Sequence, residues 1–405
     1  MPKVGAGMHT DVKVDLYSSA SYDGGHPLDQ YEVIRNTEGL YWHEELNGPG
    51  FWAVGRHADA NAVSRATHSF TSWQGTFMWD MDEASLAMMR QFMLLMDPPR
   101  HSFYRRLATP AFTPRRAQSS RDAVVKIVNG LLDDVAERDE FCLVRDLIGA
   151  LPLYVIADVL GFPRSEALQM YDHMRVIAAA PDSVTEAQRS ESLTTVYTFG
   201  MQLGHEKRRS PGDDLSSVLV RGEVDGAQLR EEEFAAFFLL LVDAGADTTR
   251  NSLGAGLIQL MADPDQWQAL RDGSDALLAT AANEILRWSS PVVHMRRTAT
   301  QDIEIGGQLV REGEKVVLFY GAANHDPTVF ENPQRFDITR AKNPHVAFGS
   351  GGPHVCLGAH LARLEIQEML RGILGRLRPL EQTGPATWDQ SNYIIGPETV
   401  PVRQS

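Results

Sequence analysis

One continuous stretch, from about residue 231 to residue 261, limits the possible folds more than any other part of this chain. As an α-helix it would be on the order of 45 Å long, at about 1.5 Å per residue. Its central part holds an unbroken apolar run from Phe237 to Val242, so water cannot surround it. The sequence therefore predicts a fold organised around one long buried helix that crosses the molecule.

The rest of the chain divides into helical and β-rich regions. Helical periods dominate residues 119–281, with breaks at Pro163, at the loop 210–214 and at Pro264. Short β-like runs occur before this region, at residues 51–54, and after Pro291, at residues 303–305 and 316–319. A final helix is expected from Leu357 to about Arg376. The pattern is typical of a mainly α protein with small β-sheets.

Length alone suggests more than one domain. A chain of 405 residues gives two or three domains at about 150 residues each, and its 43% hydrophobic content can fill a large core. However, no internal repeat and no low-complexity linker separates the regions. We therefore expect residues 1–405 to form a single domain, with a β-rich lobe at about 29–70 plus 300–320 and a helical core at about 90–290 and 340–380.

Charge and cysteine content exclude several classes of partner. The formal net charge of −15 argues against nucleic acid or an anionic membrane surface. The two cysteines, Cys142 and Cys356, lie far apart and form no disulfide framework, and Cys142 is interpreted as a small core residue. Residues 1–19 contain no apolar run long enough for a signal peptide or membrane anchor. The sequence thus indicates a soluble, cytoplasmic protein.

The glycine-rich segment 348–358 places Cys356 directly before a strongly helical stretch. Free N–H groups and partial positive charge at a helix start lower the pKa of a thiol and favour the thiolate. The glycines, among them Gly351 and Gly358, would allow a flat ligand to approach the backbone. An isolated cysteine in a glycine turn would more often be structural, so the neighbouring residues carry the functional interpretation.

The sequence Ala244-Gly245-Ala246-Asp247-Thr248 lies within the predicted central helix. Glycine in mid-helix costs up to about 1 kcal/mol relative to alanine, which suggests that something packs against the helix or opens it there. A carboxylate among buried apolar residues also requires a reason. The alternative is that Asp247 and Thr248 simply face solvent.

These two motifs, with the Asp247–Thr248 motif preceding the cysteine loop in the chain, resemble those of the cytochrome P450 family. The resemblance extends over nearly the whole chain. It implies the family's triangular, mostly helical fold with a β-rich lobe near the N-terminus. It also implies haem b (iron protoporphyrin IX) with Cys356 as the thiolate ligand, Phe348, Gly351, Gly358, Ala244 and Gly245 beside the haem, and proton delivery by Asp247 and Thr248. The loop before Cys356 is one residue longer than usual, as in bacterial members that act on sterols and branched lipids.

The resemblance assigns further roles. Glu284 and Arg287, three residues apart on one helix, match the family's structural ion pair, and Arg335 occupies the place of its third member. Alone, such a pair would be an ordinary surface pair. Four residues match the contacts to the haem propionates, although Arg296 could replace one of them by a shift of one position. They are His101, Arg105, Arg297 and His354.

Alignment with the family also gives a predicted substrate pocket, and we expect about half of its residues to be ordinary core. The pocket is mainly apolar and indicates a hydrophobic substrate, while His294 is a polar element that could orient it. The residues are Trp73, Phe77, Met78, Trp79, Val292, Val293, His294, Met295 and Ile394.

The expected activity is insertion of one oxygen atom of O₂ into a C–H bond of a sterol, lipid or terpenoid-like molecule. Since no dinucleotide or iron–sulfur motif is present, electrons must come from NAD(P)H through a ferredoxin or flavodoxin and its reductase. We expect a monomer. Two alternatives stay open, namely a tailoring oxidase that acts on a polyketide or a carrier-bound amino acid, and a haem sensor without turnover. A peroxide-driven enzyme is disfavoured by the Asp247–Thr248 pair.

Overall fold

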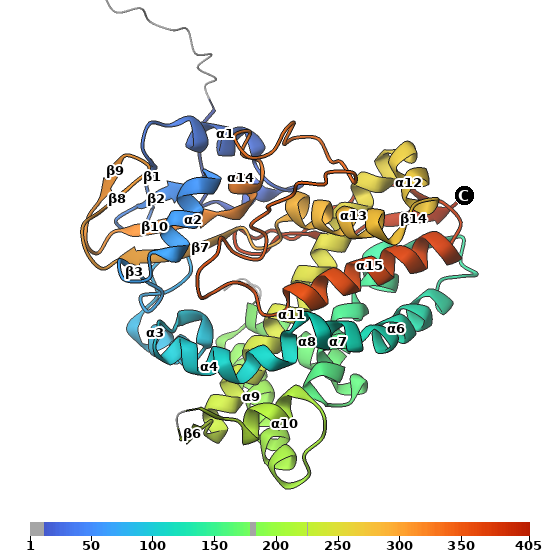
Figure 1. The fold of residues 1–405 in the computed structure, drawn as a ribbon, viewed down its shortest axis with the longest axis horizontal. Helices are drawn as coiled ribbons and strands as arrows, with labels where there is room; N and C mark the ends of the chain where they lie inside the picture. Colours follow the sequence, from blue (N-terminus) through green and yellow to red (C-terminus); the bar gives the residue numbers. More distant parts are fainter. Residues whose placement is uncertain (1–11, 179–183, 225) are drawn as a thin grey trace, which may run out of the picture.

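The computed structural model describes residues 12–178, 184–224 and 226–405. Its longest helix, α11 (Glu231–Ala262), is the one predicted from the sequence, and its 32 residues span about 48 Å. Three glutamates fill its first turn, where the helix dipole favours negative charge. α11 runs through the middle of the helical part (Figure 1) and packs against α9 (Glu186–Arg209), α7 (Ala150–Leu160) and α13 (Asp275–Ser289).

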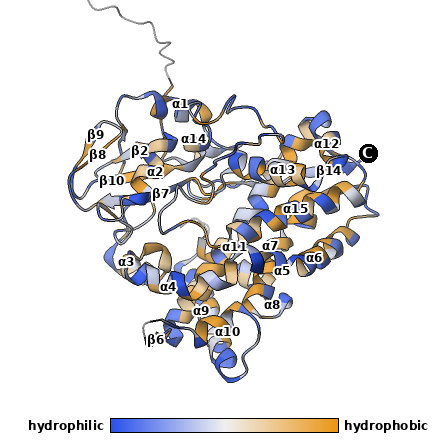
Figure 2. Ribbon diagram, viewed as in Figure 1, coloured by the Kyte–Doolittle hydropathy of each residue, from blue (hydrophilic) through white to orange (hydrophobic). Residues whose placement is uncertain are grey.

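The other large helices surround this centre. Figure 2 shows α6 and α15 with alternating hydrophobic and polar bands, which is the pattern of helices with one buried face. These two helices pack against each other, and α15 also contacts α11 and α13. The helices of this layer are α4 (Arg100–Ala108), α5 (Pro114–Ser119), α6 (Arg121–Asp133), α8 (Arg164–Ala178), α10 (Leu215–Arg221), α12 (Pro264–Arg271) and α15 (Ala359–Arg376).

A five-stranded sheet forms the second part of the molecule (Figure 1). Its order is β1 (Tyr41–His43), β2 (Phe51–Val54), β10 (Lys315–Phe319), β7 (His294–Ala299) and β3 (Phe70–Thr71). β10 pairs in parallel with β2 and antiparallel with β7, so segments from both ends of the chain share one sheet. Every residue of β10 is buried, as expected for a strand covered on both faces.

Smaller elements complete this part of the fold. β8 (Ile303–Ile305) and β9 (Gln308–Val310) form a hairpin across Gly306 and Gly307, and β8 is the strand expected at residues 303–305. Four short helices lie near the sheet, namely α1 (Leu28–Asn36), α2 (His57–Arg65), α3 (Glu83–Met89) and α14 (Tyr320–Asn324).

Three further small sheets lie outside the main one. β4 (Glu140–Cys142), β11 (Leu380–Gln382) and β14 (Pro401–Gln404) form one of them, and it buries Cys142 in the large helical core. The others pair β12 (Thr387–Trp388) with β13 (Pro397–Thr399) and β5 (Glu223–Val224) with β6 (Ala227–Gln228). The prediction of a mainly α fold with small sheets is confirmed.

One boundary differs from the prediction. The last helix begins at Ala359 instead of Leu357, with Gly358 as its N-cap. Of the helices in the three described ranges, none combines the length and the apolar character that crossing a membrane requires.

Candidate active site

The loop before α15 holds Cys356 in place through its own backbone. The Cys356 N–H donates to the Phe348 carbonyl at 2.9 Å, and the Gly349 N–H donates to the Val346 carbonyl at 2.9 Å. The Phe348 ring lies under the guanidinium group of Arg363, 4.6 Å from its centroid. These contacts close the loop into a turn that presents the cysteine at the start of α15.

The Cys356 side chain has an exposed surface, but it lies deep in the protein and many protein atoms surround it at longer distances. This burial is the largest influence on the thiol, and it raises the pKa of Cys356. The N–H groups of Gly358 and Ala359 and the charges of Arg105 and Arg363 act in the opposite direction. The helix start thus lowers the pKa of the thiol as expected, but burial outweighs this effect in the protein chain alone. A bound metal cation would favour the thiolate.

The glycines of the loop serve different purposes. Gly351 and Gly352 both have positive φ, and a Cβ on them would lie 2.8 Å from Arg65 Nε and 2.0 Å from the Ser64 carbonyl oxygen. They therefore let the lengthened loop pack against the end of α2. The position of Gly351 beside a cofactor stays a prediction. Gly358 is different, because the nearest atom to its missing Cβ is Cys356 Sγ at 3.9 Å.

One face of α11 is accessible in the middle of the molecule. Residues 234–239 and 251–257 are all buried, whereas Leu240, Asp243, Ala244, Asp247 and Thr248 are partly or fully accessible. Their spacing of three, four, seven and eight residues places them on one helical face. Since this stretch is flanked by buried turns of the same helix, the accessible face must line an internal space.

Gly245 does not belong to that face. A Cβ on Gly245 would contact Ile156 of α7 at 3.4 Å. The glycine thus permits close packing of α11 on α7, in agreement with the sequence-based suggestion that something packs against the helix there. Its position beside the cofactor stays a prediction. Ala244, which is exposed, is the small residue on the accessible face.

Asp247 is held in a network drawn from three segments. Its carboxylate accepts a hydrogen bond from the Tyr171 hydroxyl of α8 at 2.8 Å and pairs with Arg250 Nη2 at 3.1 Å. The same guanidinium group reaches Asp389 at 3.5 Å. Burial is the main reason that the pKa of Asp389 is raised to about 6, and the nearby Asp247 charge adds to it.

Thr248, the next residue, donates its hydroxyl to the Ala244 carbonyl at 3.0 Å. The pair therefore lies on the accessible face, with the acid fixed by its partners.

Four basic side chains converge, and none of them has a carboxylate within ion-pair distance among the described residues; the charge of Asp97 acts on His101 and Arg297 only at longer range. The rings of His101 and His354 lie 4.2 Å apart, and Arg105 and Arg297 lower the pKa values of both histidines electrostatically, in addition to burial. The pKa of His101 falls to about 4. Within residues 12–178, 184–224 and 226–405, neither ring nitrogen of His101 has a hydrogen-bond partner.

The side chains of Arg297 and Arg105 donate hydrogen bonds to backbone carbonyls. Arg297 is 7% exposed and donates to the carbonyl of Arg296 at 2.7 Å, and Arg105 donates to the Val355 carbonyl. Neither has a carboxylate within ion-pair distance in the described part of the chain. Arg296, in contrast, pairs with Asp80 at 2.6 Å, which favours Arg297 as the available cation. Buried cations without counter-charges are costly, so this cluster is suited to an anionic group of a ligand.

The predicted ion pair on α13 is fully buried. Glu284 and Arg287 are both 0% exposed, and Arg287 Nη2 lies 2.7 Å from Glu284 Oε1. The third member was predicted wrongly. The Arg335 side chain is exposed and contributes only its carbonyl oxygen, whereas Arg340 Nε pairs with Glu284 Oε2 at 3.0 Å. The loop turns between the two arginines, and only the later one points inward.

The predicted substrate residues divide into pocket and core. Phe77 stacks on Trp79 with centroids 4.8 Å apart and meets the ring of Tyr393 at 4.6 Å. Val292 forms an isolated bridge with Ile394, which joins two predicted wall segments, and Met295 is partly buried beside them.

The other members of that set do not fit a pocket wall. Met78 and Val293 are 0% exposed and belong to the core of the β-rich part. Trp73 lies at the surface under the guanidinium group of Arg90, at 4.7 Å. His294 has both ring nitrogens engaged, one by the Met78 N–H at 3.1 Å and the other by the Asn392 carbonyl at 2.9 Å. Its predicted role in orienting a substrate was therefore wrong.

Several residues of the site were missed by sequence reasoning. Tyr171 and Arg250 hold Asp247, Tyr393 joins the aromatic wall, and Asp243 lies on the accessible face of α11. The helical spacing of Asp243 and Asp247 was a signal that could have identified Asp243. The spacing of three residues between Asp247 and Arg250 could likewise have identified Arg250. Tyr171 and Tyr393 depend on contacts between distant segments.

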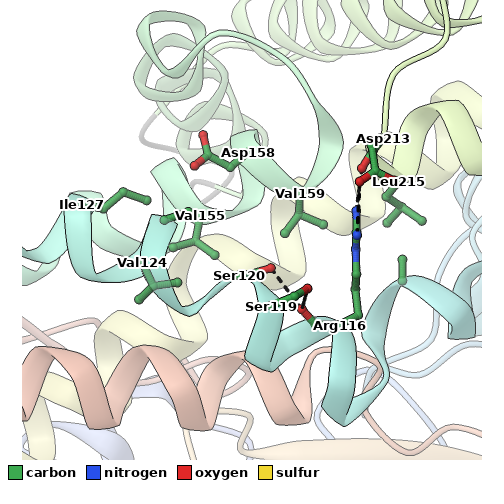
Figure 3. A pocket seen from close by; sticks show the side chains of 12 residues that line it. Arg116, Ser119, Ser120, Val124, Ile127, Val155, Asp158, Val159, Asp213 and Leu215 are labelled. Atoms are coloured by element: carbon green, nitrogen blue, oxygen red, sulfur yellow. Dashed lines mark hydrogen bonds and ion pairs between the residues drawn. The ribbon is translucent and has the colours of Figure 1, made fainter.

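A separate surface pocket lies elsewhere, with a volume of about 280 Å³. It lies between α5, α6, α7 and the segment leading into α10, and Arg116 and Asp213 form an ion pair at its edge (Figure 3). None of the predicted site residues lines it.

Comparison with known proteins identifies the family. The family model described as "Cytochrome P450" matches residues 150–398, a range that includes Asp247, Glu284, Arg297 and Cys356. The chain belongs to the cytochrome P450 family. Its catalytic class is therefore that of a P450 monooxygenase, and the family implies haem as the cofactor.

Individual relatives are similar over most of their length. The chain is 33% identical to a steroid C26-monooxygenase of Rhodococcus jostii, covering 91% of this chain and 80% of that protein. It is 36% identical to a methyl-branched lipid omega-hydroxylase of Mycobacterium bovis, covering 88% of this chain and 85% of that protein. The structure of Mycobacterium marinum cytochrome P450 CYP268A2 in complex with pseudoionone matches with a TM-score of 0.89 and 35% identity, covering 98% of this chain and all of that one.

The residues present fit a haem. Its propionates are anions, and His101, Arg105, Arg297 and His354 form a cluster that lacks anions. Cys356 is an accessible thiol in a loop beside α15, which itself packs against the helix that carries the accessible face. The chemistry of the donor set thus matches the cofactor that the family implies.

Proposed function

We propose that the protein is a haem-thiolate monooxygenase in which Cys356 ligates the iron and His101, Arg105, Arg297 and His354 bind the propionates. One oxygen atom of O₂ enters a C–H bond of a hydrophobic small molecule, and the other leaves as water. NAD(P)H supplies the electrons through a ferredoxin or flavodoxin and its reductase. The observation that carries the proposal is a cluster of four basic side chains, two buried and two half-buried, near an accessible cysteine. In the described part of the chain, none of the four has a carboxylate within ion-pair distance.

The electrostatics of the cluster support this assignment. His101 and His354 are held neutral by burial and by Arg105 and Arg297, so the two arginines carry the positive charge. The histidines can donate hydrogen bonds from neutral rings. Two propionates would neutralise the buried guanidinium group of Arg297 and the half-buried one of Arg105, and the pairing of anions with these cations offsets their desolvation.

Bound haem supplies the activation of O₂, and the chain supplies protons and positioning. Thr248 presents its hydroxyl oxygen on the accessible face of α11, where it can hold a water molecule. Asp247 carries a proton on its carboxylate toward that water, and Tyr171 and Arg250 fix its orientation. The apolar wall of Phe77, Trp79, Val292 and Ile394 excludes bulk water from the same space.

The proposed substrate class is supported by the apolar side chains expected to line the pocket and by the names of similar proteins. Aromatic and aliphatic side chains bind apolar surface and leave few polar groups to be satisfied. Relatives named for activity on a steroid and on methyl-branched lipids, and a similar structure bound to pseudoionone, favour a sterol, lipid or terpenoid-like molecule.

Turnover with isotopically labelled O₂ tests this proposal. The purified protein is supplied with NAD(P)H, a surrogate ferredoxin and its reductase, together with candidate substrates that include carrier-bound amino acids. The proposal predicts a product with one labelled oxygen atom. A haem-loaded protein that gives no product with any class would favour a haem sensor, and activity restricted to carrier-bound substrates would favour a tailoring oxidase.

A further inference from the structure

Asp243 is a carboxylate on the accessible face of α11 that no step of the proposed chemistry uses. It lies one turn before Asp247 and next to Ala244, on the face that lines the internal space. No hydrogen bond or ion pair to its carboxylate occurs within residues 12–178, 184–224 and 226–405. Asp247, only four residues away, has both Tyr171 and Arg250 as partners.

The surroundings of Asp243 contain a second polar group without a partner. The segment that carries Tyr393 is tied to α11, because Asp389 pairs with Arg250 at 3.5 Å. Burial is the main reason that the pKa of Tyr393 is raised, and the charge of Asp243 adds to it, so the phenol lies within electrostatic reach of the carboxylate. The Tyr393 ring is fixed by Phe77 at 4.6 Å and by His294 at 5.4 Å, both centroid distances. In the same described ranges, its hydroxyl forms no hydrogen bond. Two polar groups from distant segments, both without a hydrogen bond in these ranges, therefore lie within electrostatic reach of each other, and the Tyr393 ring packs against the aromatic Phe77.

An unpaired carboxylate in such a place requires a donor. Burial, together with the Asp247 charge, raises the pKa of Asp243 to about 6, and no cation offsets that shift. A carboxylate that a bound ligand separates from water without supplying a hydrogen bond is costly, so the site selects strongly for ligands that provide the missing partner.

Resting on the proposed function, we propose that Asp243 and Tyr393 form a polar subsite for a hydrogen-bond donor on an otherwise apolar substrate. The donor is a hydroxyl or a protonated amine, and the carboxylate accepts its hydrogen bond. The Tyr393 hydroxyl can accept a second hydrogen bond or donate one to the substrate oxygen. This contact fixes one end of the substrate, and thus selects the carbon that is oxidised.

Matched ligands on two skeletons test the subsite. The probes are the alcohol, the dimethylamine and the methyl ether of a dodecyl chain and of a farnesyl chain. The alcohol and the protonated amine donate a hydrogen bond, whereas the ether only accepts one. The crowded nitrogen of the dimethylamine is a poor ligand for iron, and the two donor probes distinguish a neutral donor from a cationic one.

The expected result is that at least one donor binds the wild-type protein about tenfold more tightly than the ether of the same skeleton. In Asp243→Leu this preference should fall to about one, with the ether binding as well as before or better. Tyr393→Phe should reduce the preference partly. Met295→Leu, a substitution of similar volume in the same wall, is the control that should keep it.

Affinities are measured by equilibrium dialysis as well as by the optical change of the haem. An equal affinity of donor and ether for the wild-type protein would overturn the inference, and so would a preference that persists in Asp243→Leu. These outcomes are distinct from failure of the proposed function, which would appear before any ligand is added, as a spectrum without thiolate-ligated haem.

Discussion

Arg340 Nε lies 3.0 Å from Glu284 Oε2, and Glu284 is completely buried. Arg287 binds the same carboxylate through two nitrogens, so one acid is shared by two arginines. The N–H of Asp337 and the side chain of Asn343 add two more hydrogen bonds to Glu284. The network ties α13 to the loop that precedes the cysteine segment.

Loss of Arg340 should therefore destabilise the fold. Arg340→Ala leaves a buried carboxylate with one cation instead of two, and removal of one partner of a buried pair typically costs about 3–5 kcal/mol. Denaturant unfolding of the variant, with haem content measured in parallel, checks the prediction. Arg335→Ala is the matched control, because that side chain is exposed. Equal effects of the two substitutions would contradict the network described here.

Arg297 should control retention of the cofactor. Arg297→Leu removes a buried cation that lacks an acidic partner, so the loss of one charged hydrogen bond, about 1.5–3 kcal/mol, should weaken haem binding roughly tenfold or more. Arg297→Lys should restore part of it. The measurement is the rate of haem transfer to an excess of an acceptor protein. Arg311→Leu, on an exposed ion pair, should behave as wild type, and a loss of similar size there would count against a specific role.

Thr248 should couple electron use to product. Thr248→Ala removes the hydroxyl beside Asp247, so more NAD(P)H should be consumed for each molecule of product. Thr249→Val is the control, because Thr249 is buried away from the accessible face. The ratio of product to NAD(P)H oxidised is measured for both variants. An unchanged ratio in Thr248→Ala would contradict the proposed proton path.

Glu365 on α15 should make stability depend on pH. It is 4% exposed, and its Oε2 has no partner in the described residues. Burial raises its pKa from 4.5 to about 8. Between these values the folded state holds a proton that the unfolded state has lost, so the free energy of unfolding falls as pH rises.

Glu365→Gln should remove this dependence. The variant should be more stable than wild type at pH 8 by roughly 2 kcal/mol, with a smaller difference at pH 5. Urea unfolding at the two pH values measures it. A difference that is larger at pH 5 would show that Glu365 is ionised in the folded protein.

The parts of the fold that could be predicted from the sequence are those with a periodic or local signal. The central helix follows from its continuous apolar stretch, and the Glu284–Arg287 pair follows from spacing within one helix. The residues around Cys356 and Asp247 carry motifs that are contiguous in the chain. In each case the contact lies between neighbours in sequence, so spacing determines it.

The errors come from loops and from strands buried on both faces. No periodicity shows which arginine of the loop between Asn332 and Arg340 turns inward. In β7 five of six residues are buried, so alternation cannot show that His294 points away from the pocket. Sequence also could not show which segments pack against Gly245 and Gly351, because their contacts with α7 and α2 join distant parts of the chain.

We propose that Cys356 ligates a haem iron in a pocket for hydrophobic molecules. The most direct test is the optical spectrum of the purified protein, recorded in the ferric state during titration with sterols, fatty acids and terpenoids, and in the reduced state with carbon monoxide. The account predicts thiolate-type spectra in both states, a shift toward high spin with one class of compound, and loss of the thiolate signature in Cys356→Ser. A haem spectrum typical of histidine ligation, or a Cys356→Ser variant with an unchanged spectrum, would contradict it.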